Sequence, residues 1–240
     1  MSERDEADPY LVWKGWGTDF AKLKPGDVQY YDSELRDVIN LRGDLRVLEV
    51  GFGNGAFLAY CASRSWTVTG TELLADLVAI AREAGFDAHH AADLGALPDA
   101  AFDLIVAFDV FEHIPPSESV GFLRSLATKL APGGRIVLRF PNVDTWIGNP
   151  LQHGDVTHVN DIGVLKMEYY AREAALELAR VRGVRRRGFS TSIIHGLHKY
   201  TAGVAIKIYA GVAKALFFPD LRVVLSTSSV VCVLRRRSPV

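Results

Sequence analysis

An acid precedes three alternating glycines in the first quarter of the chain. Glu49 lies near the end of a short apolar run, and Gly51, Gly53 and Gly55 follow it. Because glycine lacks a Cβ atom, these positions can adopt positive φ angles and let a ligand approach the backbone. A carboxylate here would repel a phosphate but attract a cationic amine or a sulfonium. The spacing also differs from the Gly-x-Gly-x-x-Gly fingerprint of dinucleotide-binding folds. A tight turn without a ligand is the alternative interpretation.

Two further acids stand at the ends of strand-like segments. Glu72 closes the run at residues 67–72 and lies 17 positions after Gly55. Its two oxygens could accept hydrogen bonds from both hydroxyls of a ribose, although a solvated acid at a strand end is the alternative. Asp109 closes the apolar run at residues 102–109. Because open parallel sheets bind ligands beyond the carboxyl ends of their strands, we expect chemistry at residues 109–113.

Three histidines and one more acid could accept protons or bind a metal. His113 follows Asp109 closely, whereas His153, Asp155 and His158 lie in a long polar segment at residues 143–163. The acid could orient one histidine, or the three residues could hold a divalent metal. We favour a base and expect no metal site, because no dense cluster of carboxylates is visible. A loop whose polar residues only cap backbone groups is the remaining alternative.

The segment from Glu49 to Gly55 resembles motif I of the class I S-adenosylmethionine-dependent methyltransferases. The resemblance runs from about residue 30 to residue 142. It includes the Glu112-His113 pair and the Leu-x-Pro-Gly-Gly turn at residues 130–134. The similarity is closest to bacterial members that act on small molecules or in glycan pathways. It thins after residue 142, where a polar loop is expected to set substrate specificity.

This resemblance implies a cofactor, a reaction and a set of contacts. The cofactor would be S-adenosyl-L-methionine, and the acceptor an oxygen of a small molecule or glycan. Asp93 would accept the exocyclic amine of adenine and the Leu94 backbone N–H would meet the ring, with a turn or helix cap as the alternative for Asp93. The expected cofactor contacts are Glu49, Gly51, Gly53, Gly55, Glu72, Asp93, Leu94 and Asp109. A hydroxyl acceptor needs a base, for which the candidates are His113, His158, His153 and Asp155.

The hydrophobic pattern places these residues on an α/β framework. Together with the resemblance, it predicts a doubly wound, Rossmann-like, seven-stranded sheet that is mostly parallel with an antiparallel last strand. Expected strands cover residues 45–50, 67–72, 88–93, 102–109, 135–140, 188–193 and 229–234; expected helices cover residues 30–39, 56–63, 73–84, 121–130, 167–182 and 199–217. We expect an N-terminal arm or lid at residues 1–40 and the methyltransferase domain at 41–240, with a helical insertion at about 197–220.

Composition limits the class of partner. The chain of 240 residues has a net charge of −1, which disfavours nucleic-acid binding. The N-terminus lacks an apolar secretion signal, and Lys207 and Lys214 interrupt the longest apolar helical stretch, so we expect a cytoplasmic protein without a membrane span. The apolar stripe of the helix at residues 199–217 favours core or dimer packing, and peripheral membrane contact is the alternative.

Three rival functions remain at this stage. A nicotinamide oxidoreductase is disfavoured by the glycine spacing and by the lack of a Tyr-x-x-x-Lys pair after the fourth strand. A non-catalytic nucleoside-binding or scaffold protein would keep the same fold. A lipid-quinone O-methyltransferase differs only in its acceptor, and binding of the helix at 199–217 to liposomes would favour it. For the tryptophan-containing segment at residues 10–20, a lid and a surface arm are equally compatible with the sequence.

Overall fold

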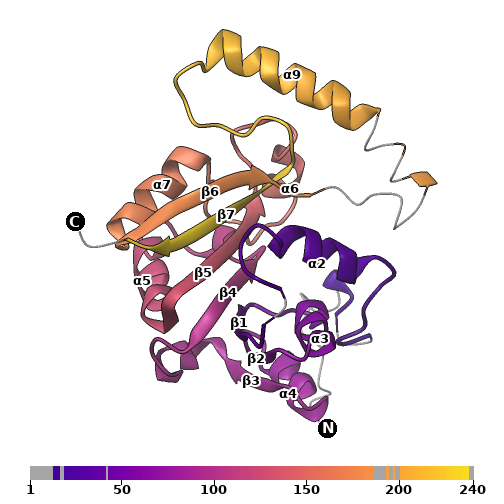
Figure 1. Ribbon diagram of the computed structural model, residues 1–240, viewed down its shortest axis with the longest axis vertical. Helices are drawn as coiled ribbons and strands as arrows, with labels where there is room; N and C mark the ends of the chain where they lie inside the picture. Colours follow the sequence, from indigo (N-terminus) through magenta and orange to yellow (C-terminus); the bar gives the residue numbers. More distant parts are fainter. Residues whose placement is uncertain are drawn as a thin grey trace, which may run out of the picture.

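The molecule is built on a twisted seven-stranded sheet with helices on both faces (Figure 1). The computed structural model describes residues 13–16, 19–41, 43–185, 193–194, 197 and 201–237. The strand order is β3-β2-β1-β4-β5-β7-β6, and β7 runs antiparallel to both of its neighbours. The strands are β1 (Arg46–Val50), β2 (Thr67–Glu72), β3 (Asp87–His90), β4 (Phe102–Phe108), β5 (Leu130–Pro141), β6 (Leu176–Gly183) and β7 (Ser229–Arg236). The predicted fold class is therefore confirmed.

The helices cover the sheet in two layers because the central strands are apolar on both faces. Alternate residues point to opposite sides, so Val47 packs with α2 and α3, whereas Leu48 packs with α5 and α7. The helices are α2 (Asp27–Leu35), α3 (Ala56–Ser63), α4 (Ala75–Glu83), α5 (Ser119–Lys129), α6 (Asn149–His153), α7 (Val164–Glu173) and α9 (Ala202–Phe217). Two short 3₁₀ helices, η1 (Ala91–Ala96) and η2 (Phe111–His113), follow β3 and β4.

The carboxyl ends of β1 and β4 are held side by side. The register pairs Val50 of β1 with Ala107 of β4. Just beyond these strands, the Gly51 N–H donates to the Thr71 carbonyl oxygen at 2.7 Å, and the Asp109 N–H donates to the Arg139 carbonyl oxygen at 2.8 Å. The loops after the two strands are thereby fixed at the same edge of the sheet.

The sixth strand lies earlier in the chain than the sequence pattern predicts. The prediction of a helix over residues 167–182 is wrong at its C-terminal end, because α7 ends at Glu173 and β6 begins at Leu176. Ala175 adopts a φ of 58° and turns the chain between them. The run Glu-Ala-Ala-Leu-Glu-Leu-Ala-Arg has high helix propensity, but pairing with β7 overrides it. Of the expected strand at 188–193, only Ile193 is described, and it is helical.

The helix α9 stands apart from the sheet (Figure 1). Only Gly203 is buried among its residues, so the expectation that its apolar stripe packs in the core is wrong. The stripe consists of side chains that remain exposed. Within the described residues, no helix combines the length and hydropathy needed to cross a bilayer.

Candidate active site

A cavity of about 700 Å³ opens at the carboxyl edge of the sheet. Its lining comes from segments far apart in the sequence: the glycine loop after β1, the turn after β4, the segment around α6 and the N-terminal segment at residues 13–16. Of the residues predicted from the sequence, it brings together Glu49, Gly51, Gly53, Asp109, His113, Asp155 and His158. Gly55, Glu72, Asp93, Leu94 and His153 do not line it.

The glycine loop requires glycine for two physical reasons. Gly51, Gly53 and Gly55 have φ angles of 70°, 51° and 73°, which side chains rarely adopt. A Cβ atom on Gly51 would also lie 2.4 Å from Cγ2 of Val110 in the neighbouring loop. The backbone at Gly51 therefore lies against the Val110 side chain, which would have to shift to make room for a Cβ atom.

Glu49 is a buried acid that faces this cavity. Glu49 is 4 % exposed. Its Oε2 atom has no hydrogen-bond partner among the described residues. Burial and the nearby Glu72 carboxylate raise the pKa of Glu49 well above its ordinary value. An unpartnered buried carboxylate gains most from a cationic ligand, which would supply the missing charge and donor.

Glu72 is engaged by the backbone of the same loop. Its Oε2 accepts a hydrogen bond from the Gly53 N–H at 2.9 Å, and its Oε1 accepts one from the Leu73 N–H at 2.7 Å. Asp93 lies farther along this edge, in η1 rather than in a strand, and is exposed. The strand expected to extend to residue 93 ends at His90 because the chain tightens into this 3₁₀ helix. The ribose and adenine contacts stay predictions.

Asp109 is paired with a cation that the sequence analysis missed. Nε of Arg139 donates to Oδ1 of Asp109 at 3.0 Å, and Nη1 donates to the Tyr30 hydroxyl at 3.0 Å. The guanidinium also lies 4.8 Å from the ring centre of Phe108. Its only signal in the sequence is a charge that directly follows the apolar residues 136–138 of the fifth strand. Arg139 joins α2, β4 and β5 at the cavity wall.

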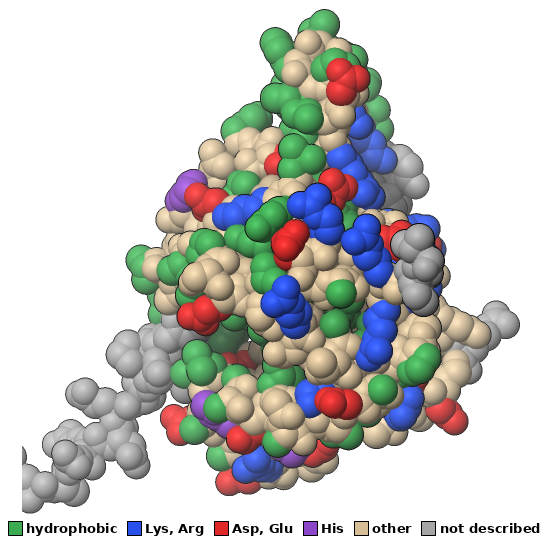
Figure 2. Space-filling model, turned by 90° about the vertical axis from the view of Figure 1, so that its left-hand side faces the viewer, with side chains coloured by type: hydrophobic (Ala, Val, Ile, Leu, Met, Phe, Trp, Pro, Cys, Tyr) green, Lys and Arg blue, Asp and Glu red, His purple; other side chains and the backbone are tan. Residues whose placement is uncertain are grey.

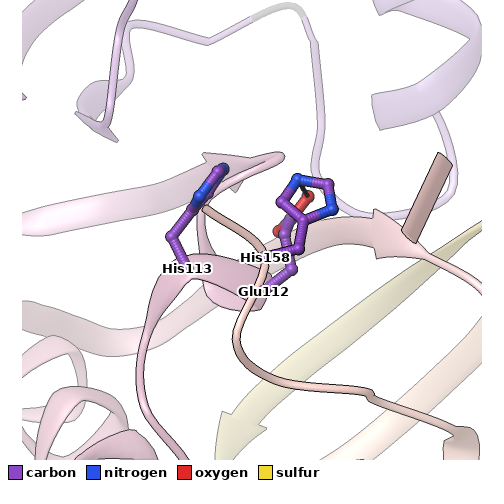
Figure 3. Close-up of side chains that lie close together, drawn as sticks. All are labelled: Glu112, His113 and His158. Atoms are coloured by element: carbon purple, nitrogen blue, oxygen red, sulfur yellow. Dashed lines mark ion pairs between the residues drawn. The ribbon is translucent and has the colours of Figure 1, made fainter. Parts of the chain in front are cut away.

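The side chains of His113 and His158 lie side by side, close to Glu112 (Figure 3). His113 ends η2, whereas His158 lies in the loop before α7, and their ring centres are 4.7 Å apart. The N–H groups of Val159 and Asn160 both donate to the Glu112 carbonyl oxygen, at 3.0 and 3.1 Å. These two bonds bring the loop to the turn after β4.

A chain of hydrogen bonds fixes the protonation of His113. The Thr157 hydroxyl lies 2.6 Å from Oδ1 of Asp155 and 2.9 Å from Nδ1 of His113. A carboxylate can only accept, so the hydroxyl donates to Asp155 and accepts from the Nδ1–H of His113. The unprotonated nitrogen is then Nε2, which has no hydrogen-bond partner among the described residues. Burial and the neighbouring His158 lower the pKa of His113, which keeps the ring neutral at pH 7.

His158 is oriented by a different contact. Its Nδ1 lies 3.0 Å from the Gln152 carbonyl oxygen, so this nitrogen carries the proton. The other nitrogen, Nε2, is 3.9 Å from Oε1 of Glu112 and 3.8 Å from Oδ2 of Asp155. These separations exceed hydrogen-bond length but keep two acids beside the ring. His153 is exposed at the end of α6 and lies away from this group.

Judged only by the distances between their ligand atoms, Glu112, His113 and His158 could also bind a metal ion. Ligand atoms of Glu112, His113 and His158 lie within 4.8 Å of one another. Both carboxylate oxygens of Glu112 are buried without a partner in the described part of the chain, and burial and Asp109 raise its pKa to about 8. However, the Lys14 ammonium already binds Oδ2 of Asp155 at 2.9 Å. That positive charge opposes a second cation nearby.

An N-terminal segment covers one side of the cavity, which is lined by Trp13, Lys14 and Trp16. Cζ2 and Cη2 of Trp16 would each lie 3.2 Å from a Cβ on Gly53, so the indole covers the glycine loop. Phe20 packs edge-to-face on Phe52 at 6.1 Å, and the Ala21 N–H donates to the Asn54 carbonyl oxygen at 2.9 Å. With Lys14 bound to Asp155, this segment spans both sides of the cavity.

The model of one protein family matches most of this sheet. Described as "Methyltransferase domain", it matches residues 26–187. The chain belongs to the class I S-adenosyl-L-methionine-dependent methyltransferases. The fold of this methyltransferase is similar to a SAM-dependent methyltransferase from Archaeoglobus fulgidus, with a TM-score of 0.67 and 18 % identity over 95 % of this chain and 100 % of that one. It is also similar to magnesium protoporphyrin IX methyltransferase from Synechocystis PCC 6803, crystallised with bound SAH (TM-score 0.56, 16 % identity, 88 % and 82 % coverage).

Curated relatives of the methyltransferase carry a more specific name. A ubiquinone biosynthesis O-methyltransferase from Xanthomonas oryzae pv. oryzae is 27 % identical over 170 residues, which cover 62 % of this chain and 70 % of the relative. A protein of the same name from Aromatoleum aromaticum is 27 % identical over 158 residues, or 58 % and 67 % of the two chains. At 27 % identity, the name of these relatives does not establish which acceptor this chain methylates.

The residues of the cavity fit the cofactor of this family. The methyltransferase provides a bare backbone at Gly51 and Gly53 and an unpartnered carboxylate oxygen on Glu49. Such a carboxylate suits a ligand with a cationic sulfonium and an α-ammonium group. A nicotinamide dinucleotide fits this site less well, because its negatively charged pyrophosphate would lie against the negatively charged Glu49 carboxylate.

Proposed function

We propose that the methyltransferase transfers a methyl group from S-adenosyl-L-methionine to a phenolic oxygen of a small molecule, with His113 as the general base. The observation that carries this proposal is the single cavity that joins the glycine loop to the His113–Thr157–Asp155 hydrogen-bond chain. The glycine loop, where the methyl donor would bind, and a histidine of defined tautomer thus line the same cavity.

When bound, S-adenosyl-L-methionine would supply a methyl group on a sulfonium, for which the leaving group is a neutral thioether. As the new carbon–oxygen bond forms, the acceptor hydroxyl loses its proton to Nε2 of His113. The resulting imidazolium keeps its Nδ1–H on Thr157, and the Asp155 carboxylate stabilises its charge. Alignment within the cavity supplies most of the acceleration, and the base adds about 10²–10⁴-fold.

The lining of the cavity favours an aromatic acceptor. Trp13, Tyr30, Tyr31, Phe108 and Leu151 contribute apolar or aromatic surface to its walls. A phenolic hydroxyl with a pKa near 10, like that of tyrosine, loses its proton to a neutral imidazole far more readily than an alcohol does. The curated relatives are named O-methyltransferases of ubiquinone biosynthesis, which supports an oxygen acceptor on a ring. A glycan acceptor and a cytoplasmic location remain predictions.

We also propose that residues 13–16 and 19–20 form a lid, which is one of the two alternatives that the sequence leaves open for this segment. The Trp16 indole lies on the glycine loop, and Lys14 reaches Asp155 on the acceptor side. Such a lid would exclude water when both substrates are bound. The expected boundary at residue 40 stays a prediction.

The proposal is tested by methyl transfer from deuterium-labelled S-adenosyl-L-methionine. Phenol, catechol and methyl glucoside are offered to the wild type and to His113→Gln, and products are identified by mass spectrometry. Label on the oxygen of phenol or catechol, and its loss in the variant, would support the assignment. Label only on the glucoside would replace the phenolic acceptor with a sugar, and label at the same rate in the variant would exclude His113 as the base.

A further inference from the structure

The outer face of α9 is an exposed apolar surface. Within this helix only Gly203 is buried. Val204, Ile208, Val212 and Leu216 form one stripe at four-residue spacing and are 48 %, 64 %, 53 % and 69 % exposed. Apolar side chains continue at Phe217, the last residue of the helix, and beyond it at Phe218 and Leu221. In Figure 2, hydrophobic side chains gather along the projecting top of the molecule. Exposed contiguous apolar surface of this kind marks an interaction site.

Aromatic side chains extend this surface toward the active site. Nε1 of Trp146 lies 3.3 Å from the Tyr209 hydroxyl of α9, and Trp146 is 68 % exposed. Trp146 precedes α6, whose Leu151 is 47 % exposed and lines the large cavity. Tryptophan and tyrosine have an apolar body and a polar edge, which suits the boundary between lipid and water.

A second cavity, of about 480 Å³, lies where α9, the end of α2 and the end of β6 meet, and four cations contribute to its lining. Arg36 comes from the end of α2, Arg182 and Arg185 from the end of β6, and Lys207 from α9. Arg182 pairs with Glu34, and Arg185 pairs with Asp37. Among the described residues, Arg36 and Lys207 make no ion pair, and the Nε groups of Arg182 and Arg185 are buried without a partner. The lining therefore carries an excess of positive charge.

We propose that the outer face of α9 and this basic cavity together form a docking surface for an anionic phospholipid bilayer. The apolar stripe would enter the acyl boundary, while the cavity would take lipid phosphate groups. Helix α9 contains two lysines and no acid, which gives charge complementarity to an anionic surface. Stripe-to-stripe pairing of two copies would instead place the lysines of one α9 beside those of the other. The proposal does not depend on which acceptor the enzyme methylates.

Flotation with vesicles tests this docking surface. The full chain is mixed with vesicles of phosphatidylcholine alone or of phosphatidylcholine with phosphatidylglycerol. We expect binding to the anionic vesicles that weakens with salt. The double variant Ile208→Ser with Leu216→Ser should bind at least about tenfold more weakly, and Lys207→Gln about fivefold more weakly. Matched controls are Leu165→Ser and Lys24→Gln, which alter exposed residues on other elements.

Three outcomes would overturn the proposal. The first is equal binding, or none, to the two kinds of vesicle while the variants keep the melting temperature of the wild type. The second is a wild-type dimer in light scattering that becomes monomeric in the double variant, because the stripe would then be occupied by a second copy. The third is binding of inorganic phosphate, abolished by Lys207→Gln, without any vesicle binding.

Discussion

Nδ1 of His113 lies 2.9 Å from the hydroxyl of Thr157, a residue 44 positions later in the chain. This contact joins the turn after β4 to the loop before α7. The same hydroxyl donates a hydrogen bond to Oδ1 of Asp155 at 2.6 Å. It fixes Nε2 as the basic nitrogen of His113. The general-base proposal rests on this relationship.

Replacing His113 by Gln should lower kcat by about 10²–10⁴-fold and change KM little, because a base acts on the transition state more than on binding. Wild-type kcat/KM should rise with pH through a pKa below 6.5, since burial and His158 lower the pKa of His113 and only the neutral ring accepts a proton. Thr157→Val should retain part of the activity, with a changed pH profile. A larger loss in His158→Gln than in His113→Gln would assign the base to His158.

Glu112 should make stability fall as pH rises. Burial and Asp109 raise its pKa to about 8 in the folded protein, above the ordinary value that applies when the chain is unfolded. Between these two values the folded state holds a proton that the unfolded state has lost, so the free energy of unfolding decreases with pH. The slope approaches about 1.4 kcal/mol per pH unit. Because the pKa of Glu49 is raised in the same way, Glu112→Gln should make the decline in melting curves from pH 5 to pH 8 shallower without abolishing it, and an equally steep decline in the variant would contradict this.

Gly51 should tolerate alanine much less well than Gly85 does. Both have positive φ angles, 70° and 87°, but a Cβ on Gly51 would meet Val110 at 2.4 Å whereas none would meet an atom within 4 Å at Gly85. Gly85→Ala therefore costs about 1–2 kcal/mol of strain, and Gly51→Ala costs about 1–3 kcal/mol more through overpacking. Denaturant unfolding of both variants measures the difference, and equal losses would mean that Val110 simply moves aside.

The framework of the site follows from short-range patterns. The apolar runs that end at Val50, Glu72 and Phe108 each form a strand, and the first of these strands pairs with both of the others. The positive φ angles of the glycine loop could be anticipated because only glycine accepts them cheaply. These features are local, and the register of a parallel sheet then brings them to one edge.

The position of β6, the role of Arg139 and the choice between the two later histidines depend on tertiary contacts that no local pattern encodes. The helical propensity of residues 173–180 hides β6, which forms because β7 offers an unpaired edge. Arg139 belongs to the cavity only because Asp109 and Tyr30 approach it from other elements. Likewise, the choice between His153 and His158 depends on the turn of the loop after α6, which buries Asn160 against Ser119 and Ile114.

Removing the Trp16 indole should weaken cofactor binding. The ring covers the glycine loop at Gly53, so a lid role predicts about tenfold weaker binding of S-adenosylhomocysteine by Trp16→Ala, from the lost apolar contact. Trp146→Ala removes a tryptophan that is 68 % exposed and outside the cavity lining, and it serves as the control. Binding that becomes tighter in Trp16→Ala would show that the segment blocks the loop instead of closing over the cofactor.

The most direct test of the account is calorimetric titration of the wild type and of Glu49→Gln with S-adenosylhomocysteine, with NADH as the comparison ligand. The account predicts micromolar binding of S-adenosylhomocysteine by the wild type, no heat from NADH, and at least about tenfold weaker binding by Glu49→Gln, since a buried carboxylate facing a cationic group is lost. No binding of S-adenosylhomocysteine by the wild type, or equal binding by the variant, would contradict the cofactor site described here.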